Sequence, residues 1–290
     1  MTDVLFGLDS TTSAATGDDP VGDAVRAEAL GFDFVSASDH PSSGHPTLET
    51  WTLLSWIAAS TTRIQVATRV LGVPNRPPPI VAKMAETLDR LSGGRLILGL
   101  GGGYADDEFK AFGLRVPTPR NKVDGLEEAI RIMHGLWSES AFAFEGEHYR
   151  TEMAELEPKP SRRIPIWLGT LGPRALRLTG RLADGWIPSL DQAPPERVPM
   201  LYEQILRGAH EAERDPSDIT LAYNMEIRID EQAALEPGVV TGSPDAVIER
   251  LIGFTELGFT AMNFQPIGPG RDEQIERLAT EVIPAVREAD

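Results

Sequence analysis

Asp39 and His40 form the pair of side chains in this sequence with the clearest capacity for acid–base chemistry, and Pro41 follows them directly. Histidine titrates near neutral pH and can pass a proton between reacting groups. An adjacent carboxylate can orient the imidazole ring or raise its pKa. The pair stands where a predicted strand ends, so a catalytic role for the pair is one of two interpretations. A helix-capping Asp beside a surface His is the alternative interpretation.

Two glycine-rich segments have the composition of ligand-binding turns. Gly169-Thr170-Leu171-Gly172 precedes a predicted helix beginning at Pro173, and free N–H groups at a helix N-terminus bind anions such as phosphate. Gly101-Gly102-Gly103 ends a predicted strand, where the absence of side chains lets a flat ligand or a phosphate approach the backbone. Tyr104 occupies the last position of the run, so the dinucleotide fingerprint G-x-G-x-x-G is not matched. A plain turn is the alternative for both segments.

The other acidic residues and histidines give weaker indications of a functional site. Asp106, Asp107 and Glu108 begin a predicted helix. Because acids there complement the helix dipole, we expect them to be solvent-facing caps. His40 and His45 are too isolated from other ligands to predict a metal site. His148 is a candidate for substrate contact, because it lies in a segment outside the regular pattern of elements.

Short apolar strands alternate with amphipathic helices along the whole chain and position these residues. Such alternation implies a parallel sheet, and eight units in 290 residues predict an α/β protein with a closed (β/α)8 TIM barrel, a single domain over 1–290. Active sites of such barrels lie at the carboxyl ends of the strands. The predicted strands are 4–8, 32–36, 64–71, 95–100, 166–169, 185–187, 219–227 and 259–264. The predicted helices are 20–30, 48–60, 80–91, 106–112, 123–137, 173–182, 196–213, 244–257 and 272–286.

Residues 138–163 interrupt this alternation between the fourth helix and the fifth strand. The sequence Ala141-Phe142-Ala143-Phe144, followed by Glu145-Gly146-Glu147, predicts a small hairpin and then an extended loop. Lids and substrate loops of barrels belong at the carboxyl-terminal face. We therefore expect this insertion to lie over that face and to take part in substrate choice.

Composition excludes several classes of function. The chain carries 44 acidic against 27 basic residues, a formal net charge of -17, so neither nucleic acid nor an anionic membrane surface is an expected partner. It contains no cysteine, which excludes disulfides, iron–sulfur clusters and thiol catalysis. The first residues lack the basic and apolar regions of a secretory signal, and no apolar run is long enough to span a bilayer. We expect a cytoplasmic protein that acts on a small molecule.

Several motifs resemble those of the bacterial luciferase-like superfamily, and they extend over nearly the whole chain. The most specific is the run from Leu88 to Gly101, which reads L-D-R-L-S-G-G-R-L-I-L-G-L-G. Further matches are Arg76-Pro77-Pro78-Pro79, Phe144-Glu145-Gly146, Pro165-Ile166-Trp167-Leu168-Gly169 and Ala183-Asp184-Gly185-Trp186. The resemblance implies a (β/α)8 barrel that binds FMN or the deazaflavin coenzyme F420. Ser38-Asp39-His40 is similar to the F420-dependent branch, in which a histidine at this point lies over the ring.

The resemblance also implies a role for individual residues. His40 would transfer a proton or stabilise charge beside the reacting carbon, with Asp39 supporting it. Counting back from Arg76 places the non-proline cis peptide of the superfamily at Arg69–Val70, where it would back the ring. Tyr104 would line the substrate pocket. The residues implied in cofactor binding are Thr68, Arg69, Val70, Gly102, Gly103, Gly169, Thr170, Leu171 and Gly172, the last four through N–H groups to phosphate.

Three functions are compatible with this resemblance. The first is an F420-dependent oxidoreductase that transfers a hydride to or from a small organic substrate. The second is a monooxygenase that uses FMN reduced by a separate reductase, and the third is a non-catalytic flavin-binding protein. Arg69 or Arg174 would offset the repulsion between an acidic protein and an anionic cofactor. The superfamily further implies a homodimer.

Overall fold

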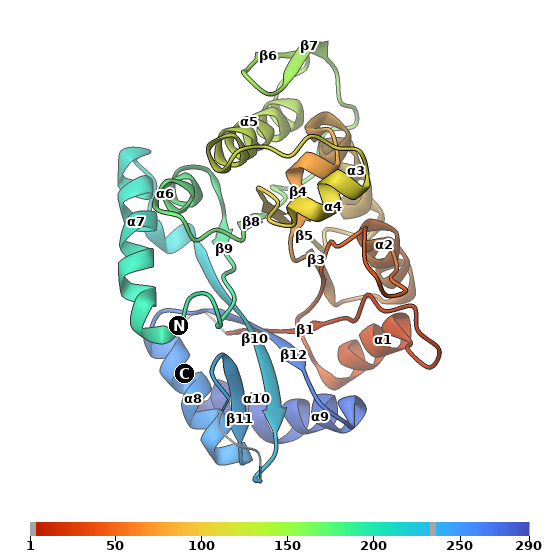
Figure 1. The fold of residues 1–290 in the computed structure, drawn as a ribbon, viewed down its shortest axis with the longest axis vertical. Helices are drawn as coiled ribbons and strands as arrows, with labels where there is room; N and C mark the ends of the chain where they lie inside the picture. Colours follow the sequence, from red (N-terminus) through yellow and green to blue (C-terminus); the bar gives the residue numbers. More distant parts are fainter. Residues whose placement is uncertain (1–3, 233–235, 290) are drawn as a thin grey trace.

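The structure is a computed structural model that describes residues 4–232 and 236–289. Eight parallel strands close into a barrel that is surrounded by helices (Figure 1), which confirms the predicted (β/α)8 fold. Neighbouring strands follow the order of the chain, and β12 pairs with β1 to close the ring. The barrel strands are β1 (Leu5–Asp9), β2 (Phe34–Ala37), β3 (Gln65–Thr68), β5 (Leu96–Gly101), β8 (Ile166–Leu168), β9 (Gly185–Trp186), β10 (Thr220–Ile229) and β12 (Ala261–Pro266).

The helices between these strands have nearly the predicted bounds. Proline occupies the first turn of several of them, where its missing N–H is not needed. The α-helices are α1 (Pro20–Leu30), α2 (Thr50–Ser60), α3 (Pro78–Leu91), α4 (Asp106–Ala111), α5 (Pro119–Ser138), α6 (Pro173–Leu182), α7 (Val198–Glu211), α8 (Pro244–Glu256), α9 (Arg271–Arg277) and α10 (Ile283–Ala289). A π-helical turn, Leu278–Val282, joins the last two, which the sequence predicts as one helix. Short 3-10 turns cover Val73–Asn75, Pro195–Arg197 and Pro216–Asp218.

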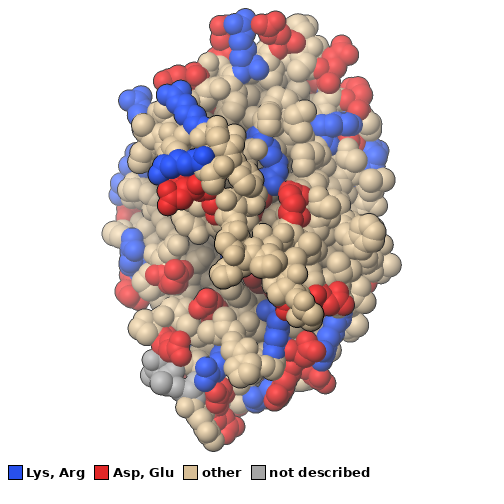
Figure 2. Space-filling model, turned by 45° about the vertical axis from the view of Figure 1, so that its right-hand side comes forward, with Lys and Arg blue, Asp and Glu red and all other residues tan. Residues whose placement is uncertain are grey.

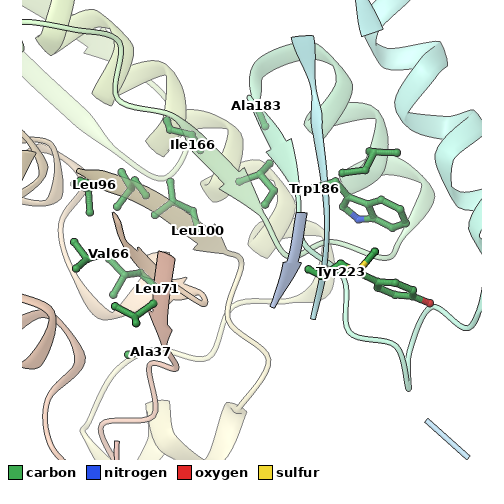
Figure 3. Packing of buried hydrophobic residues seen from close by; sticks show 14 of the residues in the cluster. Ala37, Val66, Leu71, Leu96, Leu100, Ile166, Ala183, Trp186 and Tyr223 are labelled. Carbon is green, nitrogen blue, oxygen red and sulfur yellow. The ribbon is translucent and has the colours of Figure 1, made fainter. Parts of the chain in front are cut away.

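Alternation along each strand divides the core into two layers. Side chains such as Val66, Leu96 and Ile166 pack between the barrel and its helices (Figure 3). The intervening residues fill the barrel interior, where the rings of Phe34 and Trp167 meet edge to face. Because these strands are buried on both faces, most of their residues are apolar, and this explains the short apolar runs in the sequence.

The third predicted strand is broken by a change in backbone geometry. It ends at Thr68, the Arg69–Val70 peptide bond is cis, and β4 (Leu71–Gly72) then pairs with the end of β5. The cis bond lies where the resemblance predicted it, and that prediction is confirmed. A short strand after β10, β11 (Val239–Gly242), extends the sheet beyond the barrel.

The insertion forms the predicted hairpin, from β6 (Phe142–Glu145) and β7 (Arg150–Ala154). Its expected position over the carboxyl-terminal face is wrong, because it packs against the outer side of α5 (Figure 1). Glu128 on α5 accepts hydrogen bonds from the backbone N–H groups of residues 147–149. The reason is the direction of α5, which carries the chain away from the strand ends before the insertion begins.

Within the described ranges, no helix has both the length and the apolar character needed to cross a membrane. Acidic and basic side chains lie interspersed on the face drawn in Figure 2.

Candidate functional site

A cavity of about 730 Å³ opens at the carboxyl ends of the barrel strands. The segments that follow β2, β4, β5, β8 and β9 line it, together with residues of β10 and β12 and the N-terminal turns of α4, α5 and α6. The volume is in the range of small-molecule and cofactor sites. Most of the residues that the sequence indicated line this cavity, namely Asp39, His40, Arg69, Val70, Gly102, Gly103, Tyr104, Gly169, Thr170, Leu171 and Gly172.

Two of the predicted site residues lie elsewhere. The Thr68 hydroxyl donates to the carbonyl of Gly99 at 2.7 Å and is buried behind the cavity wall. His148 belongs to the hairpin turn on the outer side of α5 and is not among the residues that line the cavity. Its predicted substrate contact has no geometric support, because the hairpin lies on the outside of the helix layer.

His40 pairs with Glu108, a residue 68 positions away. The Nδ1 atom of His40 lies 2.7 Å from Oε1 of Glu108, with side-chain exposures of 37% and 17%. The expectation that Glu108 faces solvent is therefore wrong, whereas its neighbour Asp107 is 97% exposed. α4 buries Phe109, which turns the preceding residue towards the cavity. The position before a buried phenylalanine is the one sequence signal that distinguishes Glu108 from the other two acids.

Asp39 has a different partner from the one expected. Its carboxylate accepts two hydrogen bonds from Arg76, at 2.8 and 3.0 Å, and one from the N–H of Gly72 at 3.1 Å. The Asp39 side chain is 1% exposed. Through these bonds Asp39 holds the loop against β4, and the neighbouring His40 is left to pair with Glu108. Burial would lower the pKa of Arg76, but its bonds to Asp39 and Glu49 raise that pKa above its ordinary value.

Tyr104 and the glycines before it form one side of the cavity mouth. The Tyr104 ring meets the His40 ring edge to face, with centroids 5.7 Å apart, and the residue is 81% exposed. Gly103 has φ +77, and a Cβ there would lie 2.4 Å from the ring of Phe109. A Cβ on Gly102 would lie 3.1 Å from the carbonyl oxygen of Lys122 on α5. Close packing of the strand end against α4 and α5 thus already requires these glycines, whether or not a ligand is present.

Val70, which follows the cis bond, projects between two strand ends. A Cβ on Gly101 would lie 2.8 Å from a Val70 methyl group, and one on Gly169 would lie 3.3 Å from it. Val70 lines the cavity and also packs on the interior layer of the barrel. It therefore presents an apolar surface against which a flat ring can lie.

The N-terminus of α6 opens on the cavity without a side-chain cap. Gly172 is the N-cap residue, Pro173 follows it, and a Cβ on Gly172 would have no atom within 4 Å. The first N–H groups of a helix have no partner inside the helix. Thr170 holds this turn in place, because its carbonyl accepts from the indole N–H of Trp186 at 2.8 Å. The arrangement is suited to an anion.

The two arginines expected to balance a negative cofactor are both paired with acids. Arg69 lines the cavity, and its Nε and Nη2 atoms donate to Oδ1 of Asp9 at 3.1 and 2.9 Å. Arg174 is 53% exposed and pairs with Asp124 on α5. It is not among the residues that line the cavity. Lys122, which does line it, pairs with Asp106 at 2.5 Å.

Curated relatives match most of the chain. It is 29% identical to an F420-dependent glucose-6-phosphate dehydrogenase of Nakamurella multipartita and 28% identical to that of Kineococcus radiotolerans, with 91% of each chain covered in both comparisons. The fold is similar to that of an F420-dependent secondary alcohol dehydrogenase, with a TM-score of 0.89 and 21% identity over 98% of this chain and 99% of the other. An F420-dependent tetrahydromethanopterin reductase of Methanopyrus kandleri gives a TM-score of 0.83 at 22% identity, over 97% and 99%.

A model of the luciferase-like monooxygenase family matches residues 4–236. The match includes the cis peptide, the His40 loop and the glycines of the cavity wall, and it extends over most of the 290 residues. The chain therefore belongs to the luciferase-like monooxygenase family.

Proposed function

We propose that this protein is an oxidoreductase that transfers a hydride between coenzyme F420 and a small organic substrate. The observation that carries the proposal is the His40–Glu108 pair, 2.7 Å apart, in a cavity that is also lined by an uncapped helix N-terminus. Relatives 26–29% identical to the chain bear names of F420-dependent enzymes. A proton-transfer pair and an anion site on one cavity are what such an enzyme needs.

The residues present fit a deazaflavin cofactor. Val70 supplies an apolar surface for a flat ring, and the first turn of α6 supplies N–H groups for a phosphate. Gly172 leaves open space beside those N–H groups, because a Cβ there would contact nothing within 4 Å. When bound, coenzyme F420 supplies a carbon centre that accepts or releases a hydride.

His40 accepts or donates the proton in the proposed reaction. With the Glu108 carboxylate accepting from Nδ1, the Nε2 atom is left to exchange a proton with the substrate. In alcohol oxidation, Nε2 takes the hydroxyl proton while the hydride leaves the substrate carbon. In the reverse direction, Nε2 returns the proton to the carbonyl oxygen. Glu108 fixes the tautomer and neutralises the imidazolium that forms.

Titration of the purified protein with F420 and with FMN, followed by fluorescence in one buffer, tests the cofactor. We expect the dissociation constant for F420 to be at least tenfold lower than that for FMN. Preference for FMN together with oxygen uptake would favour a two-component monooxygenase. A third outcome, tight F420 binding with no turnover difference between wild type and His40→Ala, would favour a non-catalytic binding protein.

The predicted homodimer is also a proposal. Exposed apolar side chains on α2 and α3, namely Trp56, Ile80 and Leu91, support an interface on that side of the barrel. Light scattering of the purified protein over a range of concentrations tests it, and a monomer at all concentrations would contradict it.

A further inference from the structure

A side arm of about 250 Å³ extends from the cavity between the segment that follows β9, the strands β10 and β12, and residues 237–238 after β10. The two spaces share five lining residues, namely Arg69, Ser189, Gln192, Asn224 and Gln265. A molecule held at His40 can therefore extend into the arm. The side chains that line the arm therefore determine which chemical group the protein accepts at the end of a substrate away from His40.

Two carboxylates, Asp191 and Glu226, line the arm. Arg69 is the cation lining it in the described part of the chain, and Asp9 holds that guanidinium through two hydrogen bonds. Side-chain exposures of 15% for Arg69 and 9% for Asp9 make this a nearly buried ion pair. Asp9 offsets the charge of Arg69 at contact distance. Among the described residues, the remaining charges that line the arm are therefore the carboxylates of Asp191 and Glu226, both on exposed residues.

The neighbouring basic residue does not alter this balance. Arg228 follows Glu226 by two positions on β10, and its Nε and Nη2 atoms donate to Asp230 at 3.1 and 2.6 Å. Residues 233–235, outside the described ranges, are Ala-Ala-Leu and add no charge.

A chain of side-chain hydrogen bonds determines whether the Ser189 hydroxyl at the arm donates or accepts. Ser36 donates to Oδ1 of Asn263 at 3.0 Å, and Nδ2 of Asn263 donates to Oδ1 of Asn224 at 2.8 Å. Nδ2 of Asn224 then donates to Oγ of Ser189 at 3.0 Å. Ser36 and Asn263 are fully buried and Asn224 is 6% exposed. Since Ser189 accepts from Asn224, its own hydrogen is free to be donated to a ligand oxygen.

We propose that the arm binds an uncharged, hydroxyl-bearing part of the substrate and rejects a phosphate ester; this rests on the proposed function of the cavity. A hydroxyl group can accept from Ser189 and donate to Glu226 or to the amide oxygen of Gln265. A phosphate dianion would instead face two carboxylates without a cation that is free to pair with it. The substrate class is therefore a neutral alcohol or polyol, or the corresponding carbonyl compound, in contrast to the sugar phosphate named for the curated relatives.

A charge-reversal pair tests the rejection of phosphate. Glu226→Lys introduces a cation into the arm, and Glu249→Lys makes the same charge change on an exposed residue of α8 that does not line it. Calorimetric titration with glucose 6-phosphate, with and without F420, compares these variants with the wild type. We expect Glu226→Lys to bind the sugar phosphate about tenfold more tightly than the other two proteins. Equal affinity in all three, including no detectable binding, would overturn the proposal.

Turnover with substrate pairs that differ only in phosphate provides the second measurement. F420 reduction is followed with glucose and glucose 6-phosphate, and with glycerol and glycerol phosphate, and 2-propanol and cyclohexanol serve as further neutral alcohols. We expect any turnover to be confined to the neutral compounds. Higher kcat/KM for the phosphate esters would overturn the proposal while leaving F420 dependence intact. Failure of the wild type to bind F420 would instead remove the proposed function.

Discussion

The imidazole of His40 is joined to Glu108 of α4 through a contact of 2.7 Å, whereas the adjacent Asp39 is bound to Arg76. Two acids near one histidine thus have separate tasks. Glu108 faces the cavity and can act on the proton chemistry of His40, and Asp39 holds the loop that carries the histidine.

Glu108→Gln should lower the turnover rate without weakening F420 binding. The amide oxygen can still accept from Nδ1, but it cannot neutralise an imidazolium, so we expect kcat for F420 reduction to fall about 100-fold. The F420 dissociation constant should stay within about twofold, because the change leaves the proposed phosphate site at the N-terminus of α6 intact. Asp107→Asn is the matched control, since it removes the same charge from an exposed neighbour. An equal fall in kcat for both variants would contradict the role of Glu108.

Asp39→Asn should lower the stability of the fold. Removing one partner of a buried ion pair leaves the Arg76 guanidinium incompletely matched, so we expect the free energy of unfolding to fall by about 3 kcal/mol. Glu49 bonds the same arginine but is 43% exposed. Glu49→Gln should therefore cost about 1 kcal/mol or less. Urea denaturation of the three proteins at pH 7 measures both values, and a loss for Asp39→Asn no larger than for Glu49→Gln would refute the prediction.

Gly172→Asp should block the anion site at α6. The new carboxylate would cap the free N–H groups of the helix and repel a phosphate, so we expect the F420 dissociation constant to rise about tenfold. Gly172 has φ -73 and open space at its Cβ position, so the fold should tolerate the change. Gly172→Asn, which caps without charge, should have the smaller effect. Unchanged affinity in Gly172→Asp would exclude this helix end as the phosphate site.

Glu28 should make stability depend on pH in the acid range. Burial would raise the pKa of Glu28, but hydrogen bonds from the backbone N–H groups of Ile64, Arg63 and Thr62 outweigh it and lower that pKa from 4.5 to about 2. The stabilisation is complete above pH 4.5 and is lost as pH falls towards 2. With allowance for solvent screening, Glu28→Gln should lower the free energy of unfolding by about 1 kcal/mol at pH 7. Denaturation at pH 7 and at pH 3 checks this, and a constant difference between the two proteins would disagree with it.

Much of the site could be predicted because a parallel barrel brings the carboxyl ends of its strands to one face. A place at the end of a predicted strand was enough to predict that His40, Gly102 and Gly169 lie at one edge of the barrel, and all three line the cavity, as does Val70, which the resemblance supplied. The strands are mostly apolar on both faces, so runs of apolar residues predict how many strands there are and where each one lies. The cis bond at Arg69–Val70 followed from a spacing to Arg76 that the resemblance supplied.

The partners of the charged side chains were decided only in three dimensions. Proximity in the sequence favoured Asp39 as the partner of His40, but Arg76 takes both oxygens of Asp39, and the acid that contacts His40 is Glu108 of α4. The position of the insertion depended on the direction of α5. Whether the charge of Arg69 is available to a ligand depended on its contact with Asp9. The sequence by itself therefore determined the barrel and the edge where its chemistry lies. Tertiary packing decided which acid meets which base, because that depends on distances between side chains that are far apart along the chain.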